Sequence, residues 1–547
     1  MPRTPAFPPP QDGASDGQPG GTATLLTSLR GAFSGRILTE PADTDAFLWD
    51  YRRRWHGPAF AVVQPDTPAD VAAVVRWCRD HDHVVVPQGG NTGLTGASVP
   101  QAQGTAGTDR SADMMASAGQ LASVSRPAAT ASDATCSAGQ PAADRHPPAN
   151  DTKQAPHRPA VLLSLTRLNR VRRVDPIDST MVVEAGCTLL AAQQAAEAHD
   201  RLFPLSLASE GSCTVGGNLA TNAGGVQVLR YGTMRELCLG LEVVTADGEI
   251  WNGLSGLRKN NTGYDLRDLF IGSEGTLGII TAAVLKLHPC PRGRVAALAS
   301  VTSAEQALAL LAHAQSRLAS ELTAFELISR AALSLVLKHM PGSRLPLAAL
   351  ADWQVLLEVS SLKGEDEART GLEAMLAEAS EAGLLTDAAV SMSVAQFRQF
   401  WALRENISAA QTAEGRNIKH DISVPISRIG EFLRAAEHAI RAEFPQAQPI
   451  VFGHLGDGNL HFNVTPGARH AAAYDDDFTQ KEAAINRITH DCVAAHGGAI
   501  SAEHGIGVLR RTELARYKQP LELQMMRAIK QALDPQNRMN PGKLLPE

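Results

Sequence analysis

Two short clusters in the C-terminal part of the chain hold the residues best suited to chemistry. His454 and His461 flank a glycine-rich turn signal, so the chain can fold back there and bring both imidazoles to one place. Further along, Glu503 and His504 are adjacent and precede a glycine. Two imidazoles and one carboxylate leave positions open on a divalent ion, as a catalytic metal site requires. If one residue of the Glu503-His504 pair binds the metal, the other can flank it. A lone histidine is more often a buried structural residue, but three histidines and one glutamate in two glycine-rich clusters favour a catalytic metal site.

Three glycine-dense segments offer backbone N–H groups to a long anionic ligand. Residues 87–98 directly follow a predicted strand, an arrangement in which consecutive N–H groups can surround a pyrophosphate. Residues 209–225 and 260–280 are similarly rich in glycine. One such segment would be equally consistent with a surface loop, whereas three together indicate a ligand lying along the backbone. No G-x-G-x-x-G fingerprint follows a predicted strand, which argues against NAD.

Composition narrows the class of protein. With 547 residues, 44% of them hydrophobic, the chain is long enough for two or three globular units. The net charge is −7 and the basic residues are scattered, which argues against nucleic acid or an anionic membrane as a partner. None of the seven cysteines forms a C-x-x-C pair, which argues against an iron–sulfur cluster. Since no signal core or membrane-spanning run is present, we expect a cytoplasmic protein with no transmembrane segment.

Elements predicted from periodicity must position these clusters. Thr67 is a predicted N-cap of a helix that begins at Pro68, and a strand at 83–86 leads into the first glycine segment. In the same part of the chain we expect strands at 161–165, 181–185 and 241–245 and a helix at 189–199. Residues 101–159 contain no Phe, Trp, Tyr or Ile, so we interpret them as a disordered insertion.

Beyond residue 290 the pattern indicates a second unit of α+β type. Its predicted strands are 295–301, 322–327, 353–359 and 449–453, and its predicted helices are 304–318, 368–382 and 397–412, with a final helix at 514–533. This alternation favours antiparallel strands with helices on one face of the sheet.

Six motifs, in this order, resemble those of the FAD-dependent 2-hydroxy-acid dehydrogenases of the vanillyl-alcohol-oxidase-type flavoprotein superfamily. They are the first glycine segment, GGNLATNAGG at 216–225, IGSEGTLGIIT at 271–281, GHLGDGNLHFNV at 453–464, SAEHGIG at 501–507 and NPGK at 540–543. The resemblance covers roughly residues 45–100 and 160–547. It implies an α+β fold with a two-lobed FAD-binding domain, an α+β cap domain built on an antiparallel sheet, and a C-terminal helical segment.

The resemblance also implies a division of the chain. We expect a flexible tail over 1–30, the FAD-binding domain over 31–290 with its insertion at 101–159, the cap or substrate domain over 291–500, and a segment over 501–547 that returns to the flavin site. Superfamily members with covalent flavin carry a histidine in the first glycine loop, where this chain has Asn91 and Thr92, so non-covalent FAD is implied. The implied FAD contacts are Gly89, Gly90, Asn91, Thr92, Gly93, Leu94, Ser209, Gly216, Gly217, Asn218, Thr221, Asn222, Gly224, Gly278, Ile279 and Asn540.

For the metal, the resemblance implies His454, His461 and Glu503 as ligands of a divalent ion, with Zn²⁺ as the first expectation. It makes His504 the general base and a substrate contact, beside Asn463. Further implied substrate contacts are Arg404, Ser408 and Lys419. The first two lie four apart on a predicted helix and therefore on one face, and Ser408 stands where the family has threonine.

The implied reaction is oxidation of a D-2-hydroxy acid to the 2-oxo acid by hydride transfer to flavin N5. The motifs are most similar to the group acting on D-2-hydroxyglutarate, with the D-lactate and glycolate groups as alternatives. Because the chain lacks cluster-binding cysteines, an electron-transfer flavoprotein, a cytochrome or a quinone is the expected acceptor. A homodimer is left open. Two rivals are a non-redox flavin transferase of the alkyl-dihydroxyacetone-phosphate-synthase type and a flavin-carrying scaffold, and the metal-ligand set argues against the second.

Overall fold

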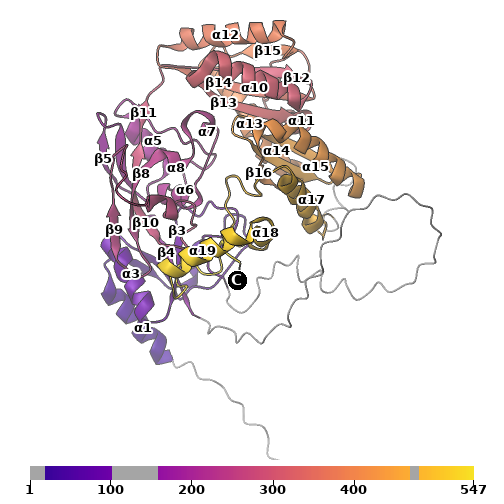
Figure 1. Cartoon of the computed structure of the whole chain (residues 1–547). Helices are drawn as coiled ribbons and strands as arrows, with labels where there is room; N and C mark the ends of the chain where they lie inside the picture. The colour runs from indigo at the N-terminus through magenta and orange to yellow at the C-terminus, as the bar shows by residue number, and fades with distance from the viewer. Residues whose placement is uncertain (1–18, 102–157, 468–477, 479, 547) are drawn as a thin grey trace, which may run out of the picture.

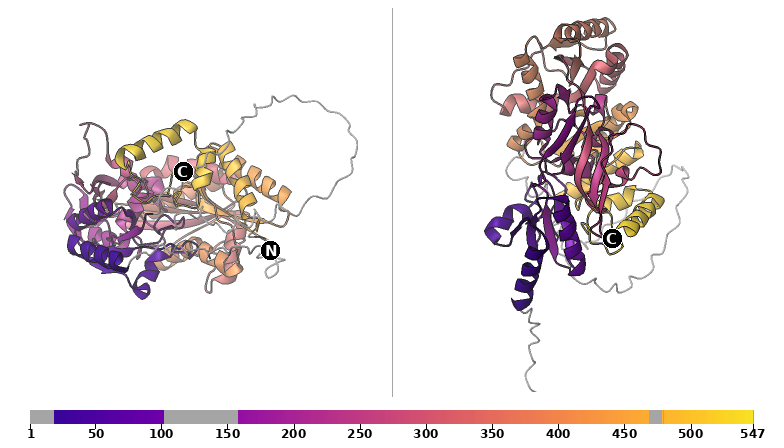
Figure 2. Two further views of the ribbon diagram at one scale, coloured as in Figure 1. Left: turned by 90° about the horizontal axis from the view of Figure 1, so that it is seen from below. Right: turned by 90° about the vertical axis from the view of Figure 1, so that its left-hand side faces the viewer.

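The computed structural model describes residues 19–101, 158–467, 478 and 480–546. Figure 1 shows two bodies, one built from the indigo and magenta segments and one from the salmon and orange segments. The yellow C-terminal helices return to the first body, as Figure 2 also shows. The mixed α and β content agrees with the predicted α+β class. Among the described residues, no helix has the length and apolar character needed to cross a membrane.

The first sheet joins the N-terminal segment to the first glycine loop. Its order is β1-β2-β4-β3, in which β2 and β3 run parallel to β4 while β1 is antiparallel to β2. The strands are β1 (Arg36–Leu38), β2 (Ala61–Gln64), β3 (Val84–Gln88) and β4 (Ala160–Ser164), and the helices are α1 (Pro19–Ala32), α2 (Pro41–Leu48) and α3 (Pro68–Asp80). The Thr67 hydroxyl accepts the Asp70 N–H in a capping box, which confirms the predicted start of α3.

Part of the expected tail over residues 1–30 forms a helix. Helix α1 begins at Pro19, packs against α3 and buries Leu29 completely. Burial of this leucine against the first sheet gives residues 19–30 a fixed place that their glycine content had not indicated. Residues 1–18 lie outside the described residues.

The second sheet is antiparallel and completes the first body. Its order is β5-β6-β10-β8-β9, and one hydrophobic core that includes Val63, Val85, Met181 and Val243 spans both sheets. The strands are β5 (Val171–Asp175), β6 (Thr180–Glu184), β8 (Cys238–Val244), β9 (Ile250–Gly253) and β10 (Ile279–Lys286), with a small pair β7 (Arg201–Leu202) and β11 (His288–Pro289). The helices are α5 (Leu189–Glu197), α6 (Val215–Thr221), α7 (Val228–Tyr231), α8 (Met234–Leu237) and α9 (Arg267–Phe270). The strands and the helix predicted in this part are confirmed.

The second body is built on a seven-stranded antiparallel sheet of order β15-β12-β14-β13-β17-β18-β16. Its strands are β12 (Gly293–Val301), β13 (Leu322–Ser329), β14 (Trp353–Ser361), β15 (Asp387–Val390), β16 (Asp421–Ser423), β17 (Gln448–His454) and β18 (Asn459–Thr465). Its helices are α10 (Ala304–Leu318), α11 (Arg330–His339), α12 (Glu365–Glu381), α13 (Val394–Glu405), α14 (Ile407–Glu414), α15 (Ile429–Glu443) and α17 (Glu482–Ala495). The predicted antiparallel sheet is confirmed.

Helices cover both faces of this sheet, which corrects the expectation of one covered face. Helices α10, α12, α15 and α17 pack on one face, and α11, α13 and α14 pack on the other. Adjacent residues such as Ala297 and Leu298 therefore enter opposite hydrophobic clusters. Because the central strands are buried on both sides, each carries apolar residues on both faces, and the one-sided alternation that would reveal a single covered face is absent.

Two predicted helices are each divided in the structure. The helix expected over 397–412 is interrupted at Asn406, which ends α13 and begins α14. The helix expected over 514–533 is separated into α18 (Arg511–Tyr517) and α19 (Pro520–Leu533). Proline lacks an N–H and fits the first turn of a helix, so Pro520 starts a new helix instead of continuing the old one.

The last residues join the first body. Met539 forms an isolated parallel bridge with Val85, and the Asn540 N–H donates to the Val85 carbonyl at 2.8 Å. The Asn540 amide also donates to the carbonyls of Ala97 and Glu274. The C-terminal segment therefore contacts the first glycine loop, whereas the four domain boundaries given above stay a prediction.

Candidate active site

The three predicted metal ligands meet at one place. His454 ends β17 and His461 lies in β18, and the tight turn between these strands brings the two rings together. Gly458 in this turn has φ +89°, and a Cβ there would lie 2.5 Å from the Val424 carbonyl oxygen, so only glycine fits. One ligand atom from each of His454, His461 and Glu503 lies within 4.8 Å of the others. Imidazole and carboxylate ligands at this spacing suit a zinc-like ion.

Strand register explains why so many polar side chains gather here. Glu326 in β13 is paired with His454, and Asp421 in β16 is paired with His461. Within β18, His461 and Asn463 are two residues apart and point to the same face. His461 pairs with Phe452, two residues before His454, so Glu326, His454, His461 and Asp421 form two neighbouring pairs on the sheet face that α11, α13 and α14 cover.

Glu326 is a site residue that the sequence reasoning missed. Its Oε1 lies 2.6 Å from Nδ1 of His454, and its Oε2 accepts a hydrogen bond of 2.7 Å from Nε of Arg404. An ionised carboxylate can only accept, so the His454 proton is on Nδ1, and Nε2, which is 3.4 Å from Glu503, faces the ligand group. The missed signal was a single carboxylate inside a fully buried strand.

Charges around His454 are strongly coupled. Burial disfavours charge on both partners, but the attraction between them is larger. Glu326 raises the pKa of His454 to about 10, and His454 together with Arg404 lowers the pKa of Glu326 to about 2. Burial has the larger effect at His461 and lowers its pKa to about 4. Although burial opposes it, the contact with His454 also lowers the pKa of Glu503, so both Glu326 and Glu503 are ionised near pH 7.

Asp421 is a second missed residue and holds His504 in place. Its Oδ2 accepts the backbone N–H groups of Glu503 and His504 at 3.0 and 2.9 Å and lies 3.4 Å from Nδ1 of His504. Its Oδ1 accepts a hydrogen bond of 3.1 Å from the Asn459 amide. Burial lowers the pKa of His504, although Asp421 opposes this, so the imidazole is neutral near pH 7 and can accept a proton.

Glu274 fixes the loop from the other side. Although buried, its carboxylate accepts the N–H groups of Ile506 and Gly507 at 2.7 and 2.8 Å. Gly505 has φ +77°, and a Cβ there would lie 2.8 Å from Oε1 of Glu274. Since Glu274 belongs to the third glycine segment, it ties the His504 loop directly to the first body.

The glycine segments surround a cavity of about 140 Å³, and His504 lines it too. Gly90 needs to be glycine because its Cβ would lie 1.9 Å from the Ser212 carbonyl oxygen, where the first two segments touch. Of the predicted FAD contacts, the cavity is lined by Gly89, Gly90, Asn91, Thr92, Gly93, Gly216, Gly217, Asn218, Thr221, Gly278 and Ile279. The other predicted contacts, Leu94, Ser209, Asn222, Gly224 and Asn540, are not among its lining residues.

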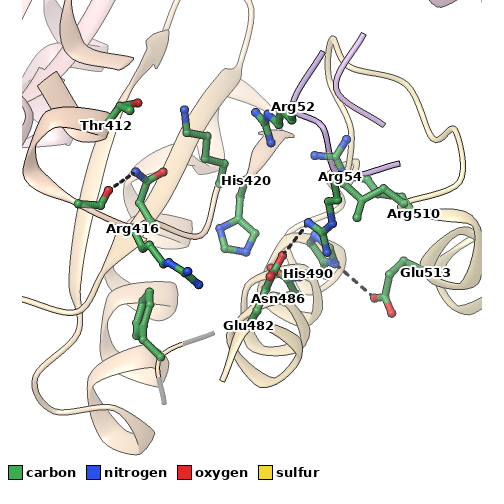
Figure 3. Close-up of a pocket in the computed structure, with 15 residues that line it drawn as sticks. Arg52, Arg54, Thr412, Arg416, His420, Glu482, Asn486, His490, Arg510 and Glu513 are labelled. Atoms are coloured by element: carbon green, nitrogen blue, oxygen red, sulfur yellow. Dashed lines mark hydrogen bonds and ion pairs between the residues drawn. The ribbon is translucent and has the colours of Figure 1, made fainter. Parts of the chain in front are cut away.

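The predicted substrate contacts are only partly brought together. Arg404 joins the ligand group through Glu326 and also lies over the Phe452 ring, with Cζ 4.8 Å from the ring centre. Asn463 is buried, accepts the His420 N–H and donates to Gln411. Ser408 is exposed on α14 while Arg404 is on α13, so the two do not share one helix as expected. Lys419 lines a separate basic cavity, which Figure 3 shows.

Comparison with known proteins matches both bodies. A model described as "FAD binding domain" matches residues 59–106 and 149–253, and one described as "FAD linked oxidases, C-terminal domain" matches residues 290–544. The mitochondrial D-2-hydroxyglutarate dehydrogenase of Bos taurus is 33% identical over 523 residues, covering 95% of this chain and 83% of that protein. The chain belongs to the D-2-hydroxyglutarate dehydrogenase family. It is therefore an FAD-linked oxidoreductase acting on a CH–OH group.

Other members of the D-2-hydroxyglutarate dehydrogenase family agree. The Xanthomonas citri D-2-hydroxyglutarate dehydrogenase is 35% identical, covering 93% of this chain and 94% of that protein. The D-2-hydroxyglutarate–pyruvate transhydrogenase of Saccharomyces cerevisiae is 30% identical, covering 92% and 90%. Residues 107–148, within the expected insertion, are matched by neither family model, and residues 102–157 lie outside the described residues.

Solved structures support the fold alone. A substrate-bound p-cresol methylhydroxylase has a TM-score of 0.66 at 14% identity, covering 96% of this chain and 97% of that chain. An alkyldihydroxyacetonephosphate synthase has a TM-score of 0.64 at 15% identity, covering 95% and 84%. The predicted fold class is confirmed.

Proposed function

We propose that the protein oxidises D-2-hydroxyglutarate to the corresponding 2-oxo acid with FAD and a divalent metal. The observation that carries this proposal is the position of His504. This residue lines the glycine cavity and also lies within 4.8 Å of Glu503 and Asp421, measured between ligand atoms. A proton acceptor at the junction of a flavin cavity and a metal-ligand group is what oxidation of an alcohol requires.

The residues present fit both a divalent metal ion and FAD. His454, His461 and Glu503 would hold the metal, for which Zn²⁺ is our proposal, and when bound it would polarise the substrate hydroxyl as a Lewis acid. The glycine segments would hold FAD, which when bound supplies a hydride acceptor at N5. We propose that it is non-covalent, since the nearby Asn91 side chain is bonded to the Trp49 carbonyl and to Ser98. The predicted contacts outside the cavity lining, such as Asn540, remain part of this proposal.

His504 takes the hydroxyl proton in this mechanism. Burial keeps its imidazole neutral beforehand, and Asp421 stabilises the imidazolium that forms. Because Asp421 also fixes the backbone N–H groups of Glu503 and of His504 itself, the ring needs no reorganisation during the transfer. The proposed substrate contacts are Asn463, Arg404, Ser408 and Lys419.

Several finer points belong to the same proposal. D-lactate and glycolate are the alternative substrates, and an electron-transfer flavoprotein, a cytochrome or a quinone is the proposed acceptor. We propose a cytoplasmic location because the cysteines of the described residues are all unpaired. The likeness to alkyldihydroxyacetonephosphate synthase is one of fold alone and favours no second function.

Four variants separate metal binding from proton transfer. His454→Ala, His461→Ala and Glu503→Ala should lose the metal, and with it most turnover, while keeping FAD. His504→Ala should keep the metal and FAD but lose roughly 10²–10⁴-fold in kcat. His199→Ala changes an exposed histidine and serves as the control. The measurements are metal content, flavin released by acid, and dye reduction by D-2-hydroxyglutarate, D-lactate, D-malate and glycolate.

Two results would contradict the proposal. A metal-free His504→Ala beside a metal-replete Glu503→Ala would reverse the two roles. Absence of dye reduction with all four acids in a yellow, metal-loaded protein would reject the dehydrogenase activity on these substrates.

A further inference from the structure

Helix α19 carries apolar side chains on two of its faces. One face holds the helix to the first body, because Leu523 is buried and Lys530 donates to the Thr276 carbonyl at 2.7 Å. The residues at i, i+4, i+7 and i+11 form a second face, and all four are apolar and exposed. They are Leu521, Met525, Ala528 and Ala532, and we call them the outer stripe. Figure 1 shows α19 along the outside of the first body.

The outer stripe is unusual for a surface helix. Such a helix normally turns charged and polar residues outward. In α19 the exposed polar residues Gln524, Arg527 and Gln531 occupy only one flank. Leu521 is 63% exposed and Met525 is 58% exposed, one turn apart. Apolar side chains aligned in this way are typical of a surface that binds an amphipathic segment.

The chain leaves and re-enters the described fold beside the C-terminal end of α19. The Arg158 guanidinium donates to the carbonyls of Gln536 and Asn537 at 2.8 and 3.0 Å, just after α19 ends at Leu533. On the other side, a Cβ on Gly542 would lie 3.3 Å from Oε1 of Gln101. Residues 102–157, which lie outside the described residues, therefore begin and end close to this helix.

These 56 residues contain only four methionine, leucine or valine side chains, and all four stand within one short stretch. They are Met114, Met115, Leu121 and Val124. Met114, Ala118 and Leu121 have the spacing i, i+4, i+7, which is also the spacing of Leu521, Met525 and Ala528. A stretch with so few apolar residues cannot build a core of its own, but it can bury them on a surface that is already formed.

The length of the connection suits this contact. Twelve residues, 102–113, separate Gln101 from Met114. A random-coil link of this length spans about 20 Å. Helix α19 has 14 residues and is therefore about 21 Å long. A link that matches the distance it must span gives an effective concentration on the order of 1 mM, so even weak binding suffices.

We propose that residues 111–126 of the same chain bind the outer stripe of α19, with Met114 and Leu121 against Leu521 and Met525. The contact is independent of the proposed reaction. It braces the C-terminal segment, because α19 leads directly to Asn540, whose N–H and amide hold Val85 and the first glycine loop.

Oxidation of Met525 by hydrogen peroxide, followed by mass spectrometry, measures whether the stripe is covered. The FAD-loaded full chain is compared with a variant in which a Gly/Ser sequence of equal length replaces residues 111–126. At an effective concentration of about 1 mM and a Kd of about 0.1 mM, Met525 should oxidise about tenfold faster in this variant.

Two controls accompany this comparison. Gly/Ser replacement of residues 128–143, an equally long stretch without methionine, leucine or valine, should leave the oxidation rate of Met525 unchanged. Met392, which is 64% exposed on the second body, should oxidise at one rate in all three proteins and thereby reports that each is folded.

A variant of α19 itself tests the contact from the other side. Met525→Gln removes an apolar side chain but keeps a good helix former. Met114 and Met115 should then oxidise several-fold faster, since they lose their cover. Gln524→Ala, on the polar flank of the helix, is the matched control and should leave both rates unchanged.

Three results would overturn the inference. One is an equal rate of Met525 oxidation with and without residues 111–126. Another is protection of Met525 that disappears on dilution and is the same in all three proteins, which would identify a second copy as the partner. The third is oxidation of Met525 as fast as that of Met392 in the unaltered protein, which would leave the stripe free for a different protein.

Discussion

Replacing Glu326 with glutamine should release metal from the ligand group while leaving FAD bound. Glu326 is completely buried and uses one oxygen for His454 and the other for Arg404. Glutamine has the same shape but only one acceptor oxygen, so its NH₂ group must face one of these two donors. Either His454 or Arg404 then loses its partner.

The structure sets the size of the effect. Loss of one buried hydrogen bond to a charged group costs about 1.5–3 kcal/mol of folding stability. His454 also loses the carboxylate that keeps its Nδ1 protonated and its Nε2 directed at the ligand group. Removing such a partner of a metal-bound histidine typically weakens metal binding about 10–100-fold. We expect both effects, with turnover falling as the metal is lost.

Glu358→Gln is a matched control. Glu358 is also a buried carboxylate on the same sheet face, in the neighbouring strand β14, and its partners are Arg294 and Trp401 instead of a histidine. It should lose about 1–2 kcal/mol of stability, since Arg294 is half exposed, and keep its metal. The assay is metal content after dialysis against graded chelator, beside denaturant unfolding and acid-released flavin.

Two outcomes would refute this reasoning. If Glu326→Gln holds metal as tightly as the unaltered protein, Glu326 does not orient His454. If Glu358→Gln loses metal to the same extent, the loss reflects general loosening of the sheet and not the carboxylate–histidine contact.

Two further predictions concern other buried groups. Glu274→Ala should lower kcat about 10–100-fold while retaining metal, because the His504 loop loses two hydrogen bonds. Hydrogen exchange of residues 503–508 should become faster in this variant. Glu249→Ala, which changes an exposed glutamate, is the control. Burial lowers the pKa of His288 to about 4, so the unfolded chain takes up a proton between pH 6.5 and 4 that the folded chain does not. Acidification through this window should lower the free energy of unfolding of the unaltered protein by roughly 2 kcal/mol, and that of His288→Gln by less, as measured by urea unfolding. If the two proteins lose stability in parallel as the pH falls, the prediction is wrong.

The ligand group was predictable because most of its members stand in short sequence motifs. His454 and His461 flank one tight turn, and Glu503 and His504 are neighbours, so local spacing alone indicated a shared position. Glu326 and Asp421 have no such local signal. Each reaches the site only through strand pairing with a histidine far away in the chain, and that register cannot be read from either strand alone.

The substrate contacts were harder to predict from the sequence for a related reason. Placing Arg404 and Ser408 on one face assumed an unbroken helix, and the break at Asn406 removes that relation. Lys419 was expected beside them, but it lines the basic cavity with Arg52, whose place depends on how the N-terminal segment lies against the second body. Contacts between bodies depend on the whole fold, and periodicity within one segment carries no information about them.

The order of the sheet accounts for how one site combines such distant residues. Strands β13, β17, β18 and β16 are neighbours, so Glu326, His454, His461 and Asp421 lie on one face of four adjacent strands, with the two histidines between the two acids. Glu326 and Asp421 each fix one histidine, His454 directly and His504 through its backbone and ring. Asp421 joins β16 to the His504 loop, and Glu274 joins that loop to the first body, so the site depends on contacts between the two bodies.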